Sequence, residues 1–162
     1  MSAAVLPPPV VANLPTVLDR LGPSWTRLDH LPFGAAVDVE HVLLSTSGVA
    51  VVTTPATVPR SQHPATEARW RARKVTALLG QVAWVPALPV LVVPATGDIG
   101  CCMREGVLVS CPDDVVSRLA HPDVRPAPLT ASITPAQVGA MVDVLLRHAA
   151  RTERVVAGHR AR

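Results

Sequence analysis

The stretch VEHVLLSTSGVAVVTTP, residues 39–55, decides the fold of this chain of 162 residues. Two apolar runs flank the turn-forming residues STSG at 45–48, in which Gly48 can adopt the positive φ that a tight turn requires. The pattern predicts a β-hairpin with strands over 37–44 and 48–54. Its second strand, GVAVVTT, is almost wholly apolar, which is typical of a strand covered on both faces. We therefore expect this strand in the middle of a sheet.

Helix and strand patterns continue on both sides of the hairpin. Upstream, apolar residues at helical spacing over 14–21 end at Gly22, and a strand over 25–30 ends before Pro32. Downstream, the patterns predict a helix over 63–81, a strand within 88–95, a strand pair within 101–111, and two helices starting at Pro112 and Pro135. This order predicts an α/β (α+β) protein with an antiparallel meander, a helical crossover and flanking helices.

Length and composition favour a single domain, because 162 residues with 49% apolar residues are enough to bury one sizeable core. We divide the chain into a proline-rich N-terminal segment over 1–12, a domain over 13–152 and a basic C-terminal tail over 153–162. The last helix of the domain is the best-marked element, since Thr134 and Gln137 at its start form a capping-box pattern.

Cysteines and hydropathy bear on the cellular compartment. Only Cys101, Cys102 and Cys111 are present, and adjacent cysteines are strained as a mutual pair, which argues against a disulfide framework. The N-terminus has a triple proline where a signal peptide needs a helical apolar region. The longest apolar run, QVAWVPALPVLVVPA, is broken by prolines and is short for a membrane span. We therefore expect a cytoplasmic protein that does not enter the membrane.

The formal net charge of +3 is unevenly distributed along the chain. One basic segment contains Arg60, Arg69, Arg71, Arg73 and Lys74, with only Glu67 to offset them. Helical spacing places Arg69 and Arg73 one turn apart and directs Arg71 away from them. Arg60, Arg69, Arg73 and Lys74 are therefore the candidates for contacts with nucleic-acid phosphates. The competing interpretation is a solvated helix face with packed arginine stems.

The run WTRLDHLPFGAAVDVEHVLLSTSGVAVVTTP, residues 25–55, resembles the core of the nuclease-related domain (NERD) of many bacterial proteins. In that family Trp-x-Val-Leu-x-x-Leu precedes Ile-Asp-His, a hairpin with a Gly-Gly-Val turn, and Asp/Glu-x-Lys. The segment HPATEARWRARKVTALLG is similar to the arginine-bearing helix of actinobacterial members, and the likeness covers most of the chain by pattern. It implies the restriction-endonuclease-like fold, a central mixed sheet with flanking helices.

The same resemblance implies where a metal centre would lie. In the family an Asp and an Asp/Glu on adjacent strands bind Mg²⁺, and the Lys positions the attacking water. These three positions fall on Glu40, Thr53 and Pro55. Threonine is a poor Mg²⁺ ligand, and proline has neither an ammonium group nor a backbone donor. The resemblance is therefore to a catalytically degenerate member, a pseudoenzyme without a resident cofactor.

Other residues could form a rearranged metal site. Asp38 and Glu40 fall on one strand face with His41 nearby, which leaves open a Mg²⁺-dependent phosphodiesterase as an alternative. His30, at the end of the preceding strand, is expected near His41. The cysteines lack zinc-ligand spacing, and there is no glycine-rich phosphate loop.

The sequence thus predicts a degenerate nuclease-related domain that acts as a binding or scaffold module, with nucleic acid as one candidate ligand. Two alternatives stay open. One is the nuclease with a rearranged site at Asp38 and Glu40. The other is a protein–protein interaction module, in keeping with the proline-rich N-terminus and the apolar residues in the tail VVAGHRAR. The sequence does not distinguish DNA, RNA and protein ligands, and it does not give the oligomeric state.

Overall fold

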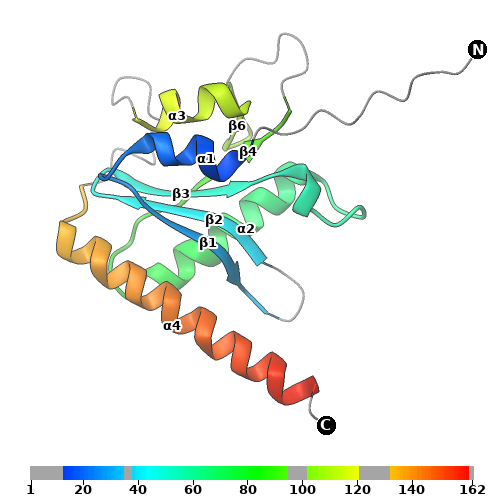
Figure 1. Ribbon diagram of the computed structural model, residues 1–162, viewed down its shortest axis with the longest axis vertical. Coiled ribbons are helices and arrows are strands. Elements are labelled where there is room, and N and C mark those ends of the chain that lie inside the picture. Colours follow the sequence, from blue (N-terminus) through cyan, green and yellow to red (C-terminus); the bar gives the residue numbers. More distant parts are fainter. Residues whose placement is uncertain (1–12, 35–37, 95–101, 121–131, 161–162) are drawn as a thin grey trace, which may run out of the picture.

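The structure is a computed structural model that describes residues 13–34, 38–94, 102–120 and 132–160 (Figure 1). The helices are α1 (Leu14–Leu18), η1 (Asp19–Leu21), η2 (Pro55–Thr57), α2 (Pro64–Leu79), α3 (Pro112–Ala120) and α4 (Pro135–Arg160). The strands are β1 (Thr26–Pro32), β2 (Asp38–Ser45), β3 (Gly48–Thr53), β4 (Leu88–Val92), β5 (Cys102–Arg104) and β6 (Val107–Ser110). The predicted N-terminal segment 1–12, together with Val37 and Cys101, lies outside the described residues.

The six strands form one mixed sheet in the order β1-β2-β3-β4-β6-β5. β1, β2 and β3 are an antiparallel meander, and α2 then carries the chain across to β4, which runs parallel to β3. β6 is parallel to β4 and closes a hairpin with β5. The predicted mixed α/β architecture, with its meander and helical crossover, is confirmed.

The central position of β3 is also confirmed. All six of its residues are buried, and they alternate between two apolar clusters. Val49 and Val51 pack in the cluster to which α2 and α4 contribute, whereas Ala50 and Val52 pack in the cluster to which α1 and α3 contribute. Figure 1 shows the resulting layers, with α1 and α3 on one side of the sheet and α2 and α4 on the other.

The hairpin turns follow the local chemistry that the sequence indicates. Gly48 has a φ of 146° at the β2–β3 turn. Glu105 and Gly106 have φ values of 47° and 78° in the β5–β6 turn, which is the backbone that a two-residue hairpin loop requires. The capping box of α4 is confirmed as well, because the Thr134 backbone N–H donates to Gln137 Oε1 at 2.9 Å and the Gln137 N–H donates to Thr134 Oγ1 at 3.2 Å.

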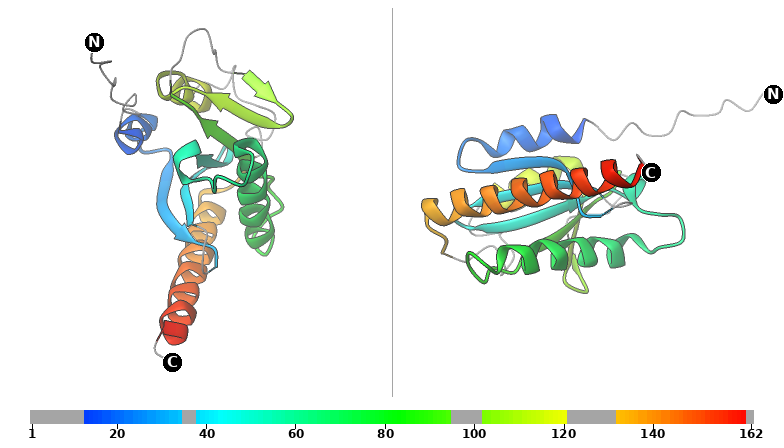
Figure 2. Two further views of the ribbon diagram at one scale, coloured as in Figure 1. Left: turned by 90° about the vertical axis from the view of Figure 1, so that its right-hand side faces the viewer. Right: turned by 90° about the horizontal axis from the view of Figure 1, so that it is seen from below.

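Two element boundaries differ from the sequence-based prediction. β1 continues through Pro32 instead of ending at residue 30. β1 is the edge strand of the sheet, where a proline can be accommodated without its missing N–H. α4 continues through Arg160, so residues 153–160 of the expected tail are helical. Figure 2 shows this C-terminal part of α4 extending beyond α2. None of the helices in the described ranges has the length and apolar character needed to cross a membrane.

Candidate polar site at the ends of β2 and β3

The Glu40 carboxylate lies beside the point where the chain leaves β3 and enters η2. The backbone N–H of Thr54 donates to Glu40 Oε2 at 2.9 Å. The Thr54 hydroxyl lies 3.1 Å from Oε1 and 3.0 Å from Oε2 of the same carboxylate. Glu40 is only 12% exposed, so these contacts replace most of the water that an isolated carboxylate would hold.

A buried arginine lies behind this contact, on the inner side of α2. Arg71 Nη1 donates to Thr57 Oγ1 at 2.9 Å, and Arg71 Nη2 donates to the Thr57 carbonyl at 2.8 Å. Thr57 Oγ1 in turn lies 3.1 Å from Glu40 Oε2. Arg71 Nε donates to Glu67 Oε1 at 2.9 Å, and the two side chains are 2% and 5% exposed. We name Glu40, Thr54, Thr57, Glu67 and Arg71 the Glu40–Arg71 network.

Sequence reasoning found only part of this network. It identified Glu40, noted Glu67 one turn before Arg71, and correctly directed Arg71 away from Arg69. It did not identify Thr57. This residue contacts Glu40, which lies 17 residues earlier in the chain, and Arg71, which lies 14 residues later. An isolated threonine in a loop gives no signal of such a role, because the contact exists only once η2 packs between β2 and α2.

The other two positions of the family's metal centre take no part in this network. Thr53 is fully buried, and within the described part of the chain its Oγ1 has no hydrogen-bond partner. Pro55 begins η2, where its carbonyl accepts a hydrogen bond of 3.2 Å from the Val58 N–H. Of the three positions, only Glu40 therefore presents an acidic oxygen.

His41 lies on the other side of Glu40 and is 2% exposed. Its Nδ1 is 2.7 Å from Asp29 Oδ1, and its Nε2 is 3.8 Å from Glu40 Oε1. Asp29 also pairs with Arg27 at 3.1 Å. The expected proximity of His30 to His41 is confirmed, with 6.1 Å between the ring centroids. His41 is therefore held between two carboxylates, and Asp29 fixes its ring.

The strands are irregular at this point. His30 has a φ of 51°, and the β1–β2 pairing includes the positions on both sides of His30 but not His30 itself. Val39 and Val42 are three residues apart, yet both pack in the cluster beneath α2 and α4, so strict alternation fails between them. Such a left-handed residue is uncommon outside glycine, although histidine is among the residues that tolerate it.

The acidic and histidine side chains near Glu40 can be compared with the ligand sets of metal centres. Across residues 13–34, 38–94, 102–120 and 132–160, no group of three or more His, Cys, Asp and Glu side chains is arranged to hold a metal ion. Asp38 is exposed at the start of β2, whereas Glu40, two residues later, is mostly covered. The chemistry that this arrangement supports is local: the carboxylate of Glu40 orients Thr54 and fixes the start of η2.

The predicted phosphate-contacting residues fall into two groups. Arg69 pairs with Glu105, with 3.1 Å between Nη1 and Oε2, so an acid at the surface partly offsets its charge. Lys74 lies over the exposed Trp70 ring, with Nζ 5.3 Å from the centroid. Arg60 and Arg73 are exposed. The structure thus leaves Arg60, Arg73 and Lys74 as the members of the set that are not paired with an acid in the described ranges.

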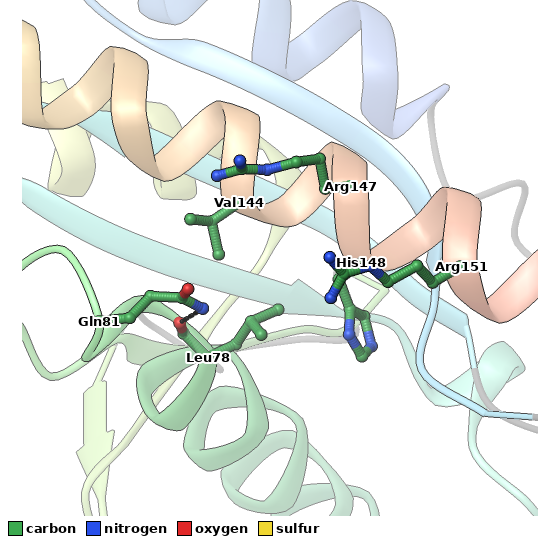
Figure 3. A pocket seen from close by; sticks show the side chains of 6 residues that line it. All are labelled: Leu78, Gln81, Val144, Arg147, His148 and Arg151. Atoms are coloured by element: carbon green, nitrogen blue, oxygen red, sulfur yellow. Dashed lines mark hydrogen bonds between the residues drawn. The ribbon is translucent and has the colours of Figure 1, made fainter.

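A pocket between α2 and α4 was not predicted from the sequence. It has a volume of about 150 Å³, and Figure 3 shows side chains of α4 facing those of α2 across it. Its lining consists of Leu78, Gln81, Val144, Arg147, His148 and Arg151. The only sequence signal was the spacing of Arg147 and Arg151 by one helical turn, which by itself indicates nothing more than a basic helix face.

Comparison of the chain with protein-family models, with curated proteins and with solved structures found no match. Function is therefore inferred below from the described residues and from the resemblance of residues 25–55.

Proposed function

We propose that this chain is a degenerate nuclease-related domain of the restriction-endonuclease-like fold, without hydrolytic activity, that acts as a module binding the phosphate backbone of nucleic acid. The observation that carries the loss of hydrolysis is the engagement of the Glu40 carboxylate by Thr54 at 2.9 Å. The mixed sheet with its helical crossover agrees with the proposed fold, and the exposed basic residues of α2 support the binding role.

Metal-dependent hydrolysis requires more than one carboxylate oxygen and a group that positions water. Glu40 is already used by Thr54 and Thr57, while Thr53 and Pro55 supply no carboxylate. Arg71 is the cation of the Glu40–Arg71 network, but it is held by Glu67 and Thr57. A guanidinium also stays protonated in proteins, so Arg71 cannot act as a base. The rearranged-site alternative would have to draw its second ligand and its base from Asp38, which is exposed, and from His41, which Asp29 holds at 2.7 Å.

Phosphate-backbone binding is favoured by the exposed side of α2. Arg73 and Lys74 are adjacent exposed cations, and Lys74 lies against Trp70, whose side chain is 37% exposed. Cations provide sequence-independent phosphate contacts, and an accessible indole offers a stacking surface for a base. Arg60, in the loop before α2, is exposed as well. This combination fits a nucleic-acid strand better than it fits a helix face that is merely solvated.

The test is a salt titration of binding to a labelled duplex and to a labelled single strand. Replacing Arg73 and Lys74 by Ala should weaken binding to all sequences to a similar degree, because backbone contacts carry no sequence information. The slope of log K against log salt should flatten by about one unit per lost contact. Arg20→Ala is the matched control, since it removes one exposed cation from the other side of the sheet and should leave the slope unchanged.

Two results would overturn the nucleic-acid part of this proposal. The first is the absence of binding at low salt to either probe. The second is binding that the Arg73→Ala/Lys74→Ala variant retains in full. In either case the protein–protein interaction module becomes the better account, and the exposed Leu146 and Val155 of α4 become the first residues to test in it.

A further inference from the structure

The pocket between α2 and α4 is lined by residues of two kinds. Leu78 and Val144 supply apolar surface, one from each helix. Arg147, His148 and Arg151 supply nitrogen groups from successive positions of α4, and Gln81 supplies an amide from α2. Figure 3 shows the His148 ring directed from α4 toward α2. The lining thus combines apolar surface from Leu78 and Val144 with side chains that carry N–H groups.

The charges of this lining are not balanced by acids. No carboxylate lines the pocket, and in the described ranges neither Arg147 nor Arg151 is in an ion pair. Arg147 Nε donates to the Asp143 carbonyl of its own helix at 3.2 Å. Like charges one turn apart on a helix repel each other. A bound anion would reduce this repulsion.

Two contacts restrict the side chains of His148 and Gln81 at the pocket. The His148 ring packs against Phe33 with 4.8 Å between ring centroids, which restricts its rotation. Gln81 Nε2 donates to the Leu78 carbonyl at 2.9 Å, so the amide is held at the edge of the pocket. A helix dipole stabilises cations only in the last turn of the helix. Because α4 continues to Arg160, the dipole does not stabilise the charges of Arg147 and Arg151.

The pocket is small, with a volume of about 150 Å³, and it is partly open to solvent. One tetrahedral oxyanion can enter a space of this size. Arginine pairs with phosphate through two parallel N–H groups, which gives it geometric selectivity for such oxyanions.

We propose that this pocket binds the phosphate group of a ligand, with Arg147 and Arg151 as its charged contacts and His148 and Gln81 as neighbouring donors. Arg73 and Lys74 are not part of the lining, and the proposal does not require that the chain bind nucleic acid. Free phosphate and the terminal phosphate of a nucleotide or strand share this chemistry, so the experiment has to distinguish these sources.

The experiment measures binding to the full chain by calorimetry at constant ionic strength. The probes are inorganic phosphate, a nucleoside monophosphate, and one single strand prepared with and without a 5′-phosphate. Acetate is the control anion. Inorganic phosphate should bind and acetate should not. Arg147→Gln/Arg151→Gln should weaken phosphate binding by about tenfold or more, because charge-assisted hydrogen bonds are lost. Arg154→Gln removes an exposed arginine of α4 outside the pocket and should bind as the parent does.

The probes then identify the source of the phosphate. Similar affinity for inorganic phosphate and for the monophosphate indicates that the ligand is a free anion. Higher affinity for the strand with a 5′-phosphate than for the strand without it indicates that the ligand is a strand end. The site proposal is overturned if no phosphate probe binds, or if Arg147→Gln/Arg151→Gln binds phosphate as the parent does. Arg73→Ala/Lys74→Ala should retain phosphate binding, so failure of the proposed α2 surface and failure of this pocket are distinguishable.

Discussion

The backbone N–H of Thr54 donates a hydrogen bond of 2.9 Å to the carboxylate of Glu40, 14 residues earlier in the chain. Glu40 is the one acidic residue among the three positions that the nuclease-related resemblance assigns to a metal centre. Its carboxylate instead fixes the exit of β3 and the start of η2. The structure of the loop is therefore sufficient to account for an acid at this position.

Replacing Glu40 by Gln should destabilise the protein by about 1–3 kcal/mol, because the loss of a charged acceptor leaves Thr54 and Thr57 poorly satisfied. Urea denaturation of the parent and the variant measures this change. Asp38→Asn is the matched control, since it makes the same chemical change two residues earlier at an exposed position. It should leave the urea midpoint nearly unchanged. Equal midpoints for Glu40→Gln and the parent would show that the carboxylate does not stabilise this loop.

The ion pair between Glu67 and Arg71 should tolerate joint replacement better than single replacement. Arg71→Met leaves the buried carboxylate of Glu67 without its partner and should destabilise the protein by about 3–5 kcal/mol. The double variant Glu67→Met/Arg71→Met removes both charges and should recover part of this loss. A double-mutant cycle in urea measures the coupling. The strong coupling expected here would be contradicted if the double variant lost as much stability as the two single variants together.

Thr53→Val should stabilise the protein by about 1 kcal/mol, because the buried hydroxyl has no hydrogen-bond partner in the described ranges and valine has nearly the same shape. Thr53→Asp, which restores an acid of the family pattern, should instead destabilise the protein, since the site is fully buried in the central strand. The thermal denaturation midpoints of the parent and of both variants measure these changes in stability. A lower midpoint for Thr53→Val would indicate that the hydroxyl makes a contact that stabilises the fold.

The sequence was sufficient for features that depend on neighbouring residues. The apolar run after Gly48 predicted a central strand, and Thr134 with Gln137 predicted the start of α4, since both signals are local. The end of β1 was wrong because it depends on context: Pro32 is accommodated on an edge strand. No signal in the sequence indicated that α4 continues through Arg160.

The polar contacts were harder to predict than the elements. Glu40 was found through the resemblance, yet its actual partners, Thr54 and Thr57, are separated from it by 14 and 17 residues. Arg71 belonged to a charged run, and only helical spacing distinguished it from its neighbours. The α2–α4 pocket could not be predicted, because its lining comes together only when Leu78 and Val144 are brought face to face by packing. Local patterns carry no information about which two helices meet.

The central claim is that this domain does not hydrolyse nucleic acid. It is tested most directly by incubating the purified protein and its Glu40→Ala variant with labelled DNA and RNA, single-stranded and duplex, in Mg²⁺ and in Mn²⁺. Circular dichroism establishes that both proteins are folded under the assay conditions. The account predicts no metal-dependent cleavage by either protein. Cleavage by the parent that disappears in the Glu40→Ala variant would contradict it and would assign Glu40 to a working metal centre.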